Sequence, residues 1–161
     1  MFLKYFNIKK NNHKNQTSSI YQEIVNHSNH FIKNSLNDRH YNFNEIFEIF
    51  TIVIIFYLKK LKDKNNQESK EISQIIIDSF VNDLDQHFRE QGIGDMSIGK
   101  YVKKYVKKFY YRLKILDNVL EQNEEIKFNN YLVKFGIINF GDYNKLNQDL
   151  NYLYNELLIG K

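Results

Sequence analysis

The sequence predicts an all-α fold: a single compact domain of about six helices, preceded by a mobile N-terminal tail. Apolar residues recur at helical spacing along most of the chain, and no segment alternates with period two for long enough to form a sheet. A length of 161 residues suits one domain with a substantial core. Hydrophobic residues make up 42% and charged residues 26%, which excludes a wholly disordered or fibrous chain.

Composition also excludes several kinds of site. The chain has no cysteine, which rules out disulfide scaffolds, zinc sites with thiolate ligands and cysteine nucleophiles. Its longest apolar stretch covers residues 46–58 and is shorter than the roughly 20 residues of a membrane-spanning helix, so we expect a buried core helix there. The first residues lack an uninterrupted apolar region and a small-residue cleavage site. We therefore expect no secretory signal and a cytoplasmic protein.

The N-terminal residues differ from the rest of the chain. Residues 1–16 contain four lysines and no acidic residue, without sustained periodicity. We interpret them as a flexible basic segment; the alternative is a short amphipathic piece that lies on a membrane surface. The helical domain then covers residues 17–161. Its first helix begins in the Ser/Thr-rich start at Thr17 and places Ile20 and Ile24 on one face.

The second helix should be the most buried one. Asn42 followed by Glu45 resembles a capping box, and the helix should run from there to about Lys62. Apolar residues lie nearly all round it, as is typical of a central helix. A third helix with one apolar stripe is expected over about residues 69–91.

A glycine-containing turn should join the third and fourth helices. Gly92 sits where a left-handed C-terminal cap is needed, and Gly94 follows two residues later, so that both glycines allow a positive φ. Asp95 or Ser97 can cap the next helix. The two helices should pack antiparallel across this turn. Their packing should bury together Phe80, Leu84, Phe88, Val102, Val106 and Phe109.

The fourth helix should end near residue 122, and two further helices are expected near residues 124–135 and 144–158, each stopped by a glycine. Residues 100–114 contain six lysines, one arginine and no acidic residue, whereas the body of the chain is mildly acidic. The lysines lie opposite the apolar stripe of the fourth helix. We call Lys103, Lys104, Lys107 and Lys108 the basic strip; Lys100 and Arg112 flank it.

Two interpretations of the basic strip remain open. It is either a solvated face or a surface that meets phosphates, whether of RNA, as at a ribosome, or of an anionic membrane. Tyr105 and Phe109 fall on the apolar side of the helix, so aromatic stacking platforms are not evident on the strip. Sequence-specific recognition of RNA is therefore not indicated.

The sequence contains no pattern that is typical of an enzyme or a metal site. Asp83, His87 and Glu90 have the spacing of metal ligands on one helix face, but no second helix with a histidine supplies the remaining ligands. Nucleophile-elbow and phosphate-loop motifs are absent. No histidine lies in a recognisable haem-ligand setting. We expect no catalytic residue, no metal, no cofactor and no small-molecule substrate.

The segment from residue 78 to residue 112, DSFVNDLDQHFREQGIGDMSIGKYVKKYVKKFYYR, resembles the signature of the ubiquinol-cytochrome c chaperone family. That pattern has an acidic and aromatic helix, then LREMGVGD, a VGK step, and a helix that ends in FYGR. Weaker similarity at residues 21–28, and at Asp38 with Glu45, extends the likeness to roughly residues 20–120. The matching residues are Asp83, Asp85, Arg89, Glu90, Gly92, Gly94, Asp95, Gly99, Lys100, Phe109, Tyr110 and Arg112.

Several positions depart from the family pattern. Asn37 stands where the family commonly has proline, and Asn42 and Phe43 stand where it has glycine and arginine. Phe50 replaces a histidine, and Tyr111 replaces the glycine of FYGR. These differences indicate a divergent member and leave the turn between the third and fourth helices unaffected.

The resemblance implies a non-enzymatic assembly chaperone that binds newly made cytochrome b and promotes assembly of ubiquinol-cytochrome c reductase. Mitochondrial relatives work near the ribosomal tunnel exit with a small partner protein, so a partner of that kind is a further implied ligand. The implied location is the cytoplasmic face of the bacterial inner membrane, or the matrix side in a eukaryote. The alternative function is that of a small helical RNA-binding or ribosome-associated protein.

The resemblance also points to a surface. We expect Gly92, Gly94 and Gly99 to build the turn, and polar groups around it to recognise the client or a partner. A purely structural role of the turn is the alternative, and the two roles are compatible. The residues expected to bind the client or a partner are Asp83, Asp85, Arg89, Glu90, Asp95, Lys100 and Arg112.

Overall fold

The computed structural model of the protein describes residues 17–35, 41–121, 125–136, 148–149 and 151–152. These residues form five helices and no strand, which confirms the all-α prediction, with five helices in place of about six. The predicted helix over 144–158 lies mostly outside the described residues, although 148–149 and 151–152 are helical; residues 1–16 also lie outside them. The helices are α1 (Thr17–Ser35), α2 (Phe43–Lys64), α3 (Gln67–Glu90), α4 (Asp95–Glu121) and α5 (Glu125–Lys134).

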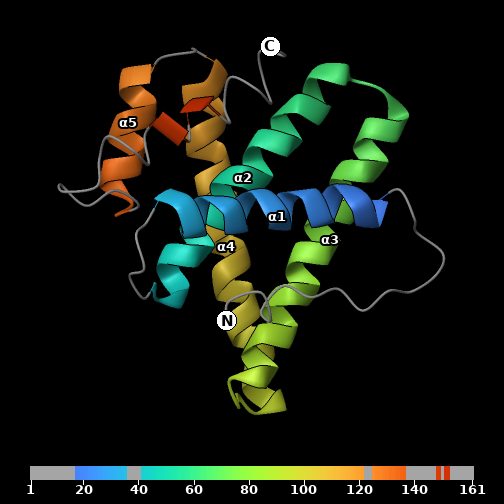
Figure 1. Cartoon of the computed structure of the whole chain (residues 1–161). Coiled ribbons are helices and arrows are strands. Elements are labelled where there is room, and N and C mark those ends of the chain that lie inside the picture. The colour runs from blue at the N-terminus through green and yellow to red at the C-terminus, as the bar shows by residue number, and fades with distance from the viewer. Residues whose placement is uncertain (1–16, 36–40, 122–124, 137–147, 150, 153–161) are drawn as a thin grey trace.

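Helix α2 is the central helix, as predicted. Every residue from 46 to 58 is buried, because α1, α3 and α4 all pack against it (Figure 1). Burying one large apolar side chain contributes about 1.5–3 kcal/mol, so this helix supplies a large part of the core energy. The capping box is confirmed: the Asn42 side chain accepts a hydrogen bond from the Glu45 backbone N–H at 3.1 Å, and the Glu45 carboxylate accepts one from the Asn42 N–H at 2.9 Å.

Helices α3 and α4 form an antiparallel hairpin whose turn lies at one end of the molecule (Figure 1). The turn is a Schellman motif, in which Gly92 N–H donates to the Arg89 carbonyl at 3.0 Å and Ile93 N–H donates to the Phe88 carbonyl at 3.1 Å. This geometry requires a left-handed residue after the helix, and Gly92 has φ +76°. The predicted role of Gly92 is therefore confirmed.

Three details of this turn differ from the expectation. Gly94 does not have a positive φ, and its carbonyl accepts the first hydrogen bond of α4, from Ile98 N–H at 3.2 Å. Gly94 therefore occupies the cap position, and Asp95 is the first residue of the helix. Gly99 lies inside α4 and takes no part in the turn.

The interface between α3 and α4 is largely the predicted one. Phe80, Leu84, Phe88 and Phe109 are buried, and the rings of Phe80 and Phe109 have centroids 5.0 Å apart. Val102 and Val106 are only partly buried because they lie at the edge of the core against which they pack. Aromatic pairs at such distances add about 0.5–1.5 kcal/mol beyond their buried area.

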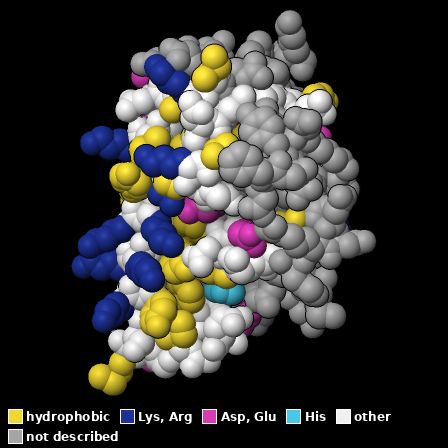
Figure 2. Space-filling model, turned by 90° about the vertical axis from the view of Figure 1, so that its left-hand side faces the viewer, with side chains coloured by type: hydrophobic (Ala, Val, Ile, Leu, Met, Phe, Trp, Pro, Cys, Tyr) yellow, Lys and Arg dark blue, Asp and Glu magenta, His cyan; other side chains and the backbone are white. Residues whose placement is uncertain are grey.

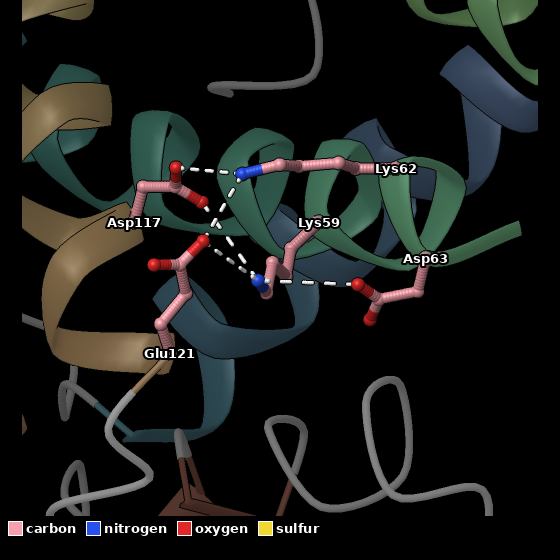
Figure 3. A network of polar contacts seen from close by, with 5 residues as sticks. All are labelled: Lys59, Lys62, Asp63, Asp117 and Glu121. Atoms are coloured by element: carbon pink, nitrogen blue, oxygen red, sulfur yellow. Dashed lines mark hydrogen bonds and ion pairs between the residues drawn. The ribbon is translucent and has the colours of Figure 1, made fainter. Parts of the chain in front are cut away.

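A cluster of charges, most of them exposed, joins α2 to the C-terminal part of α4. Lys62 Nζ lies 2.9 Å from Asp117 Oδ2 and 3.2 Å from Glu121 Oε1 (Figure 3). Lys59 Nζ lies 3.6 Å from the same Glu121 oxygen and 3.9 Å from Asp63 Oδ1. The hydrogen bonds of Lys62 raise its pKa, with Asp117 as the main cause. The cluster pairs the carboxylates of α4 with lysines of α2.

Candidate functional site

The tip of the α3–α4 hairpin carries five of the predicted binding residues, which we call the tip patch: Asp85, Arg89, Glu90, Asp95 and Lys100. All but Asp85 are exposed, and Asp85 is half-buried. Arg89 forms ion pairs with Asp85, at 2.6 Å, and with Asp95. The hydrogen bond to Asp85 is the main cause of a raised pKa of Arg89. Because Arg89 connects the last turn of α3 to the first turn of α4, its ion pairs hold Asp85 and Asp95 beside the turn. Glu90 accepts a hydrogen bond of 2.9 Å from the Gln86 side chain.

Asp83 does not lie in the tip patch. Its carboxylate is buried and accepts a hydrogen bond of 2.8 Å from the Tyr21 hydroxyl of α1. Burial raises the pKa of Asp83 to about 6, since the hydrogen bond from Tyr21 opposes this shift only in part. The pKa of Tyr21 is also raised, mainly by burial and further by the charge of Asp83. Asp83 thus joins α3 to α1 inside the protein.

Arg112 likewise lies away from the tip patch. Its guanidinium donates two hydrogen bonds of 2.8 Å to the buried carboxylate of Glu48 in α2, and lies 3.6 Å from the ring centroid of Phe135. Burial lowers the pKa of Arg112, but the hydrogen bonds and the charge of Glu48 together raise it above its ordinary value. Tyr131 of α5 packs close by, and its pKa is raised by burial. The Arg112–Glu48 pair therefore joins α2 and α4 beneath α5.

Most of the basic strip lies on the surface. Lys103, Lys104 and Lys107 are exposed. Figure 2 shows a row of Lys and Arg side chains along one edge of the molecule, with hydrophobic side chains between them. Lys108 differs, because its Nζ lies 3.4 Å from the Asn44 side-chain oxygen and 4.7 Å from the ring centroid of Tyr105. Lys108 is half-buried at the edge of this row.

Aromatic side chains also lie on α4 beside the lysines, which the sequence interpretation missed. Tyr105 and Phe109 are buried as expected, but Tyr101, Tyr110 and Tyr111 are 41%, 48% and 53% exposed. The prediction that aromatic stacking platforms are not evident on the basic strip considered only Tyr105 and Phe109, and it overlooked these three exposed rings. The spacing contained the signal, since Tyr110 follows Lys103 by seven residues and so lies on the same side of the helix.

The metal-ligand spacing of α3 does not produce a site. Asp83 and His87 are buried, whereas Glu90 is exposed at the tip. The His87 ring stacks on Phe43 with centroids 4.0 Å apart, and burial lowers its pKa. Within the described residues, no group of three or more side chains is placed to hold a metal ion. No helix among them combines the length and apolar character needed to cross a membrane.

Comparison with known proteins confirms the resemblance found in the sequence. The family model "Ubiquinol-cytochrome C chaperone" matches residues 38–133, which is more than half of the 161-residue chain. The match contains α2, α3 and α4 in full, and therefore the tip patch and the basic strip; the likeness at residues 21–28 lies outside it. No curated protein and no solved structure shows significant similarity. The chain belongs to the ubiquinol-cytochrome c chaperone family.

Proposed function

We propose that this protein is a non-enzymatic assembly chaperone that binds newly made cytochrome b and promotes assembly of ubiquinol-cytochrome c reductase. The observation that carries the proposal is the family match over residues 38–133, because it covers the hairpin and the central helix together. We further propose that the protein acts at the cytoplasmic face of the inner membrane, or on the matrix side in a eukaryote, where cytochrome b is inserted.

The tip patch is the surface that we propose for the client. Its charges of both signs can recognise polar groups on a partner, and the Arg89 ion pairs hold Asp85 and Asp95 in place at the Schellman turn. A pre-organised surface loses less conformational entropy on binding. We propose that Asp83 and Arg112 contribute by positioning, because their hydrogen bonds fix α3 and α4 against α1 and α2.

Affinity capture from detergent-solubilised membranes tests the client. The tagged protein is expected to recover cytochrome b, and a charge exchange at the tip, Glu90→Lys with Lys100→Glu, is expected to reduce recovery. The matched control is Glu68→Lys with Lys70→Glu, which exchanges two exposed charges in the first turn of α3. Failure of the unaltered protein to recover cytochrome b would refute the client. Equal recovery by both exchanged variants would refute the tip patch as its surface.

A second candidate function is that of a small RNA-binding or ribosome-associated protein. The observation that favours it is the presence of exposed tyrosines between the lysines of α4, since bases can stack on such rings while lysines contact phosphates. Co-sedimentation with ribosomes distinguishes the two functions. Nuclease-sensitive co-sedimentation without recovery of cytochrome b would support this second function.

A further inference from the structure

The outer side of α4 carries lysines for which the described part of the chain provides no anionic partner. Lys103, Lys107, Tyr110 and Lys114 follow one another at spacings of four, three and four residues, so they form one line along the helix, with Lys100 beside it. The lysines of this line and Lys100 are all exposed, and none of these four lysines forms an ion pair with any residue that the structure describes. Among the described residues, no carboxylate therefore neutralises these lysines, and Figure 2 shows Lys and Arg side chains gathered along one edge of the molecule.

The carboxylates at the two ends of α4 are paired instead. Asp95 in the first turn forms an ion pair with Arg89, and Asp117 and Glu121 near the end lie within 3.2 Å of Lys62 Nζ (Figure 3). These acidic groups are held by cations of α2 and α3, so their repulsion of an approaching anion is reduced. The lysines of α4 that form no ion pair with a described residue lie between them, over residues 100–114.

Amphipathic and apolar side chains lie on the same exposed side. Tyr110 and Tyr111 are about half exposed, and Met96 in the first turn of α4 is fully exposed. Exposing such groups to water has a free-energy cost, which an interface with an apolar layer would recover. Tyrosine is enriched where a protein meets the boundary between lipid headgroups and acyl chains.

We propose that the outer face of α4, made of Met96, Lys100, Lys103, Lys107, Tyr110, Tyr111 and Lys114, docks sideways on an anionic lipid bilayer. The lysines contact headgroup phosphates with their ammonium groups, and their aliphatic stems cover apolar surface. The tyrosine rings and Met96 enter the boundary region below the headgroups. This inference concerns lipid alone and does not depend on the identity of the client.

Three features favour a bilayer over RNA as the occupant. The cations of the face are all lysines, whereas Arg89 and Arg112, which could recognise phosphates by two parallel hydrogen bonds, are engaged with carboxylates. A fully exposed methionine offers nothing to a nucleic acid backbone but can enter a lipid layer. Finally, α4 has 27 residues and is about 40 Å long, so its side suits a flat surface.

Vesicle co-sedimentation with the full chain tests the proposal. The protein should sediment with phosphatidylcholine vesicles that contain one third phosphatidylglycerol, and should not sediment with pure phosphatidylcholine. Each lysine brought to an anionic surface raises the binding constant about fivefold. The variant with Lys103, Lys107 and Lys114 changed to Glu should therefore bind at least about 100-fold more weakly. Added salt should weaken binding of the unaltered protein.

A matched variant controls for net charge. Changing Lys33, Lys60 and Lys70 to Glu alters the total charge by the same amount at exposed positions of α1, α2 and α3. This control should retain most of the vesicle binding, because its changes lie outside α4. Circular dichroism and melting temperature should be nearly the same for both triple variants, since exposed charges contribute little to stability.

A fluorescent reporter separates lipid contact from simple charge attraction. The chain has no tryptophan, so Tyr110→Trp introduces a single reporter on the proposed face. Its emission should shift to shorter wavelength on anionic vesicles and be quenched by brominated lipids. The reporter Glu68→Trp, at an exposed position at the start of α3, should show neither change.

Several results would overturn the proposal. One is failure of the unaltered protein to bind anionic vesicles at low salt, and another is equal binding by the α4 triple variant and the control. Unshifted emission of the Tyr110→Trp variant when it is bound to vesicles would also overturn it. If RNA oligonucleotides bind through the same lysines and displace the protein from vesicles, and the tryptophan of this variant shows no shift on lipid, the face is a nucleic acid surface instead.

Discussion

The guanidinium of Arg112 in α4 donates two hydrogen bonds of 2.8 Å to the carboxylate of Glu48 in α2, 64 positions earlier in the chain. Both side chains are largely buried, with 12% and 8% of their surface exposed. The pair fixes which side of α4 faces the core. Because Lys103 and Lys107 lie on roughly the opposite side of this helix, the same contact directs the cations outward.

Removing Arg112 should therefore destabilise the protein strongly. The variant Arg112→Met should lose about 3–5 kcal/mol of unfolding free energy, because it leaves the Glu48 carboxylate buried without a cation. Urea denaturation measures this loss. The double variant with Glu48→Leu should lose less than the sum of the single variants, since it removes both charges. A loss below about 1 kcal/mol for Arg112→Met would show that the pair is not buried as described.

The left-handed turn makes a second prediction. Gly92→Val should cost more than about 1 kcal/mol, because a β-branched residue tolerates a positive φ poorly. Gly99→Ala is the matched control: Gly99 lies within α4 and a Cβ there meets nothing within 4 Å, so the change should stabilise by up to about 1 kcal/mol. Thermal unfolding followed by circular dichroism measures both. A neutral Gly92→Val would contradict the Schellman geometry.

Stability should fall as pH rises because of Asp83. Its pKa is about 6 in the folded protein and 3.8 in the absence of perturbation, so the folded state binds the proton more tightly than the unfolded state. The stabilisation of the folded state by protonated Asp83 is thus fully present below about pH 4 and is lost as pH rises through about 6. The unfolding free energy changes by roughly 3 kcal/mol over this range. Asp83→Asn should remove this loss and be more stable than the unaltered protein at pH 7.

Denaturation of both proteins across pH 4 to 8 tests this prediction. The difference in unfolding free energy between Asp83→Asn and the unaltered protein isolates Asp83 from other titrating groups, such as His87. Tyr21→Phe is a useful companion, since it removes the hydrogen bond that opposes the raised pKa. A difference that stays constant with pH would show that Asp83 is ionised at its ordinary pKa.

The exposed charge cluster of α2 and α4 should contribute little. Lys62→Ala removes two ion pairs but should cost less than about 1 kcal/mol, because the Lys62 side chain is mostly in water and Lys59 remains beside Glu121. The effect on melting temperature should shrink further in high salt. A loss comparable with that of Arg112→Met would mean that this cluster, too, is a buried contact.

Local sequence features predicted much of the fold. The largely apolar stretch over 46–58, which contains only Glu48 and Thr51 as polar residues, predicted the buried helix α2, and Asn42 with Glu45 predicted its start. Gly92 predicted the turn after α3. These features act over a few residues, through hydrogen bonds and backbone preferences that neighbouring positions decide. The resemblance of the glycine turn and its flanking charges to one family was also contained in the sequence, and the family match agrees with it.

Polar residues of the candidate site could not be placed in the same way. Asp83 and Arg112 share their polar character with surface residues, and nothing in adjacent positions distinguishes them from Asp85 or Lys107. Their burial depends on partners 62 and 64 positions away, Tyr21 and Glu48. The opposite error concerned Tyr110, an aromatic residue whose exposure was missed. Its exposure depends on which side of α4 packs against the core.

The sequence alone determined the helices, the turn and the family, because hydrophobic periodicity and capping are properties of short segments. Only the tertiary structure decided which charges are free. A charged group is stable in the core only where a complementary partner compensates for its lost hydration, and that partner comes from a distant helix. Arg112 finds one in Glu48, whereas Lys103 and Lys107 find none among the described residues and stay in water.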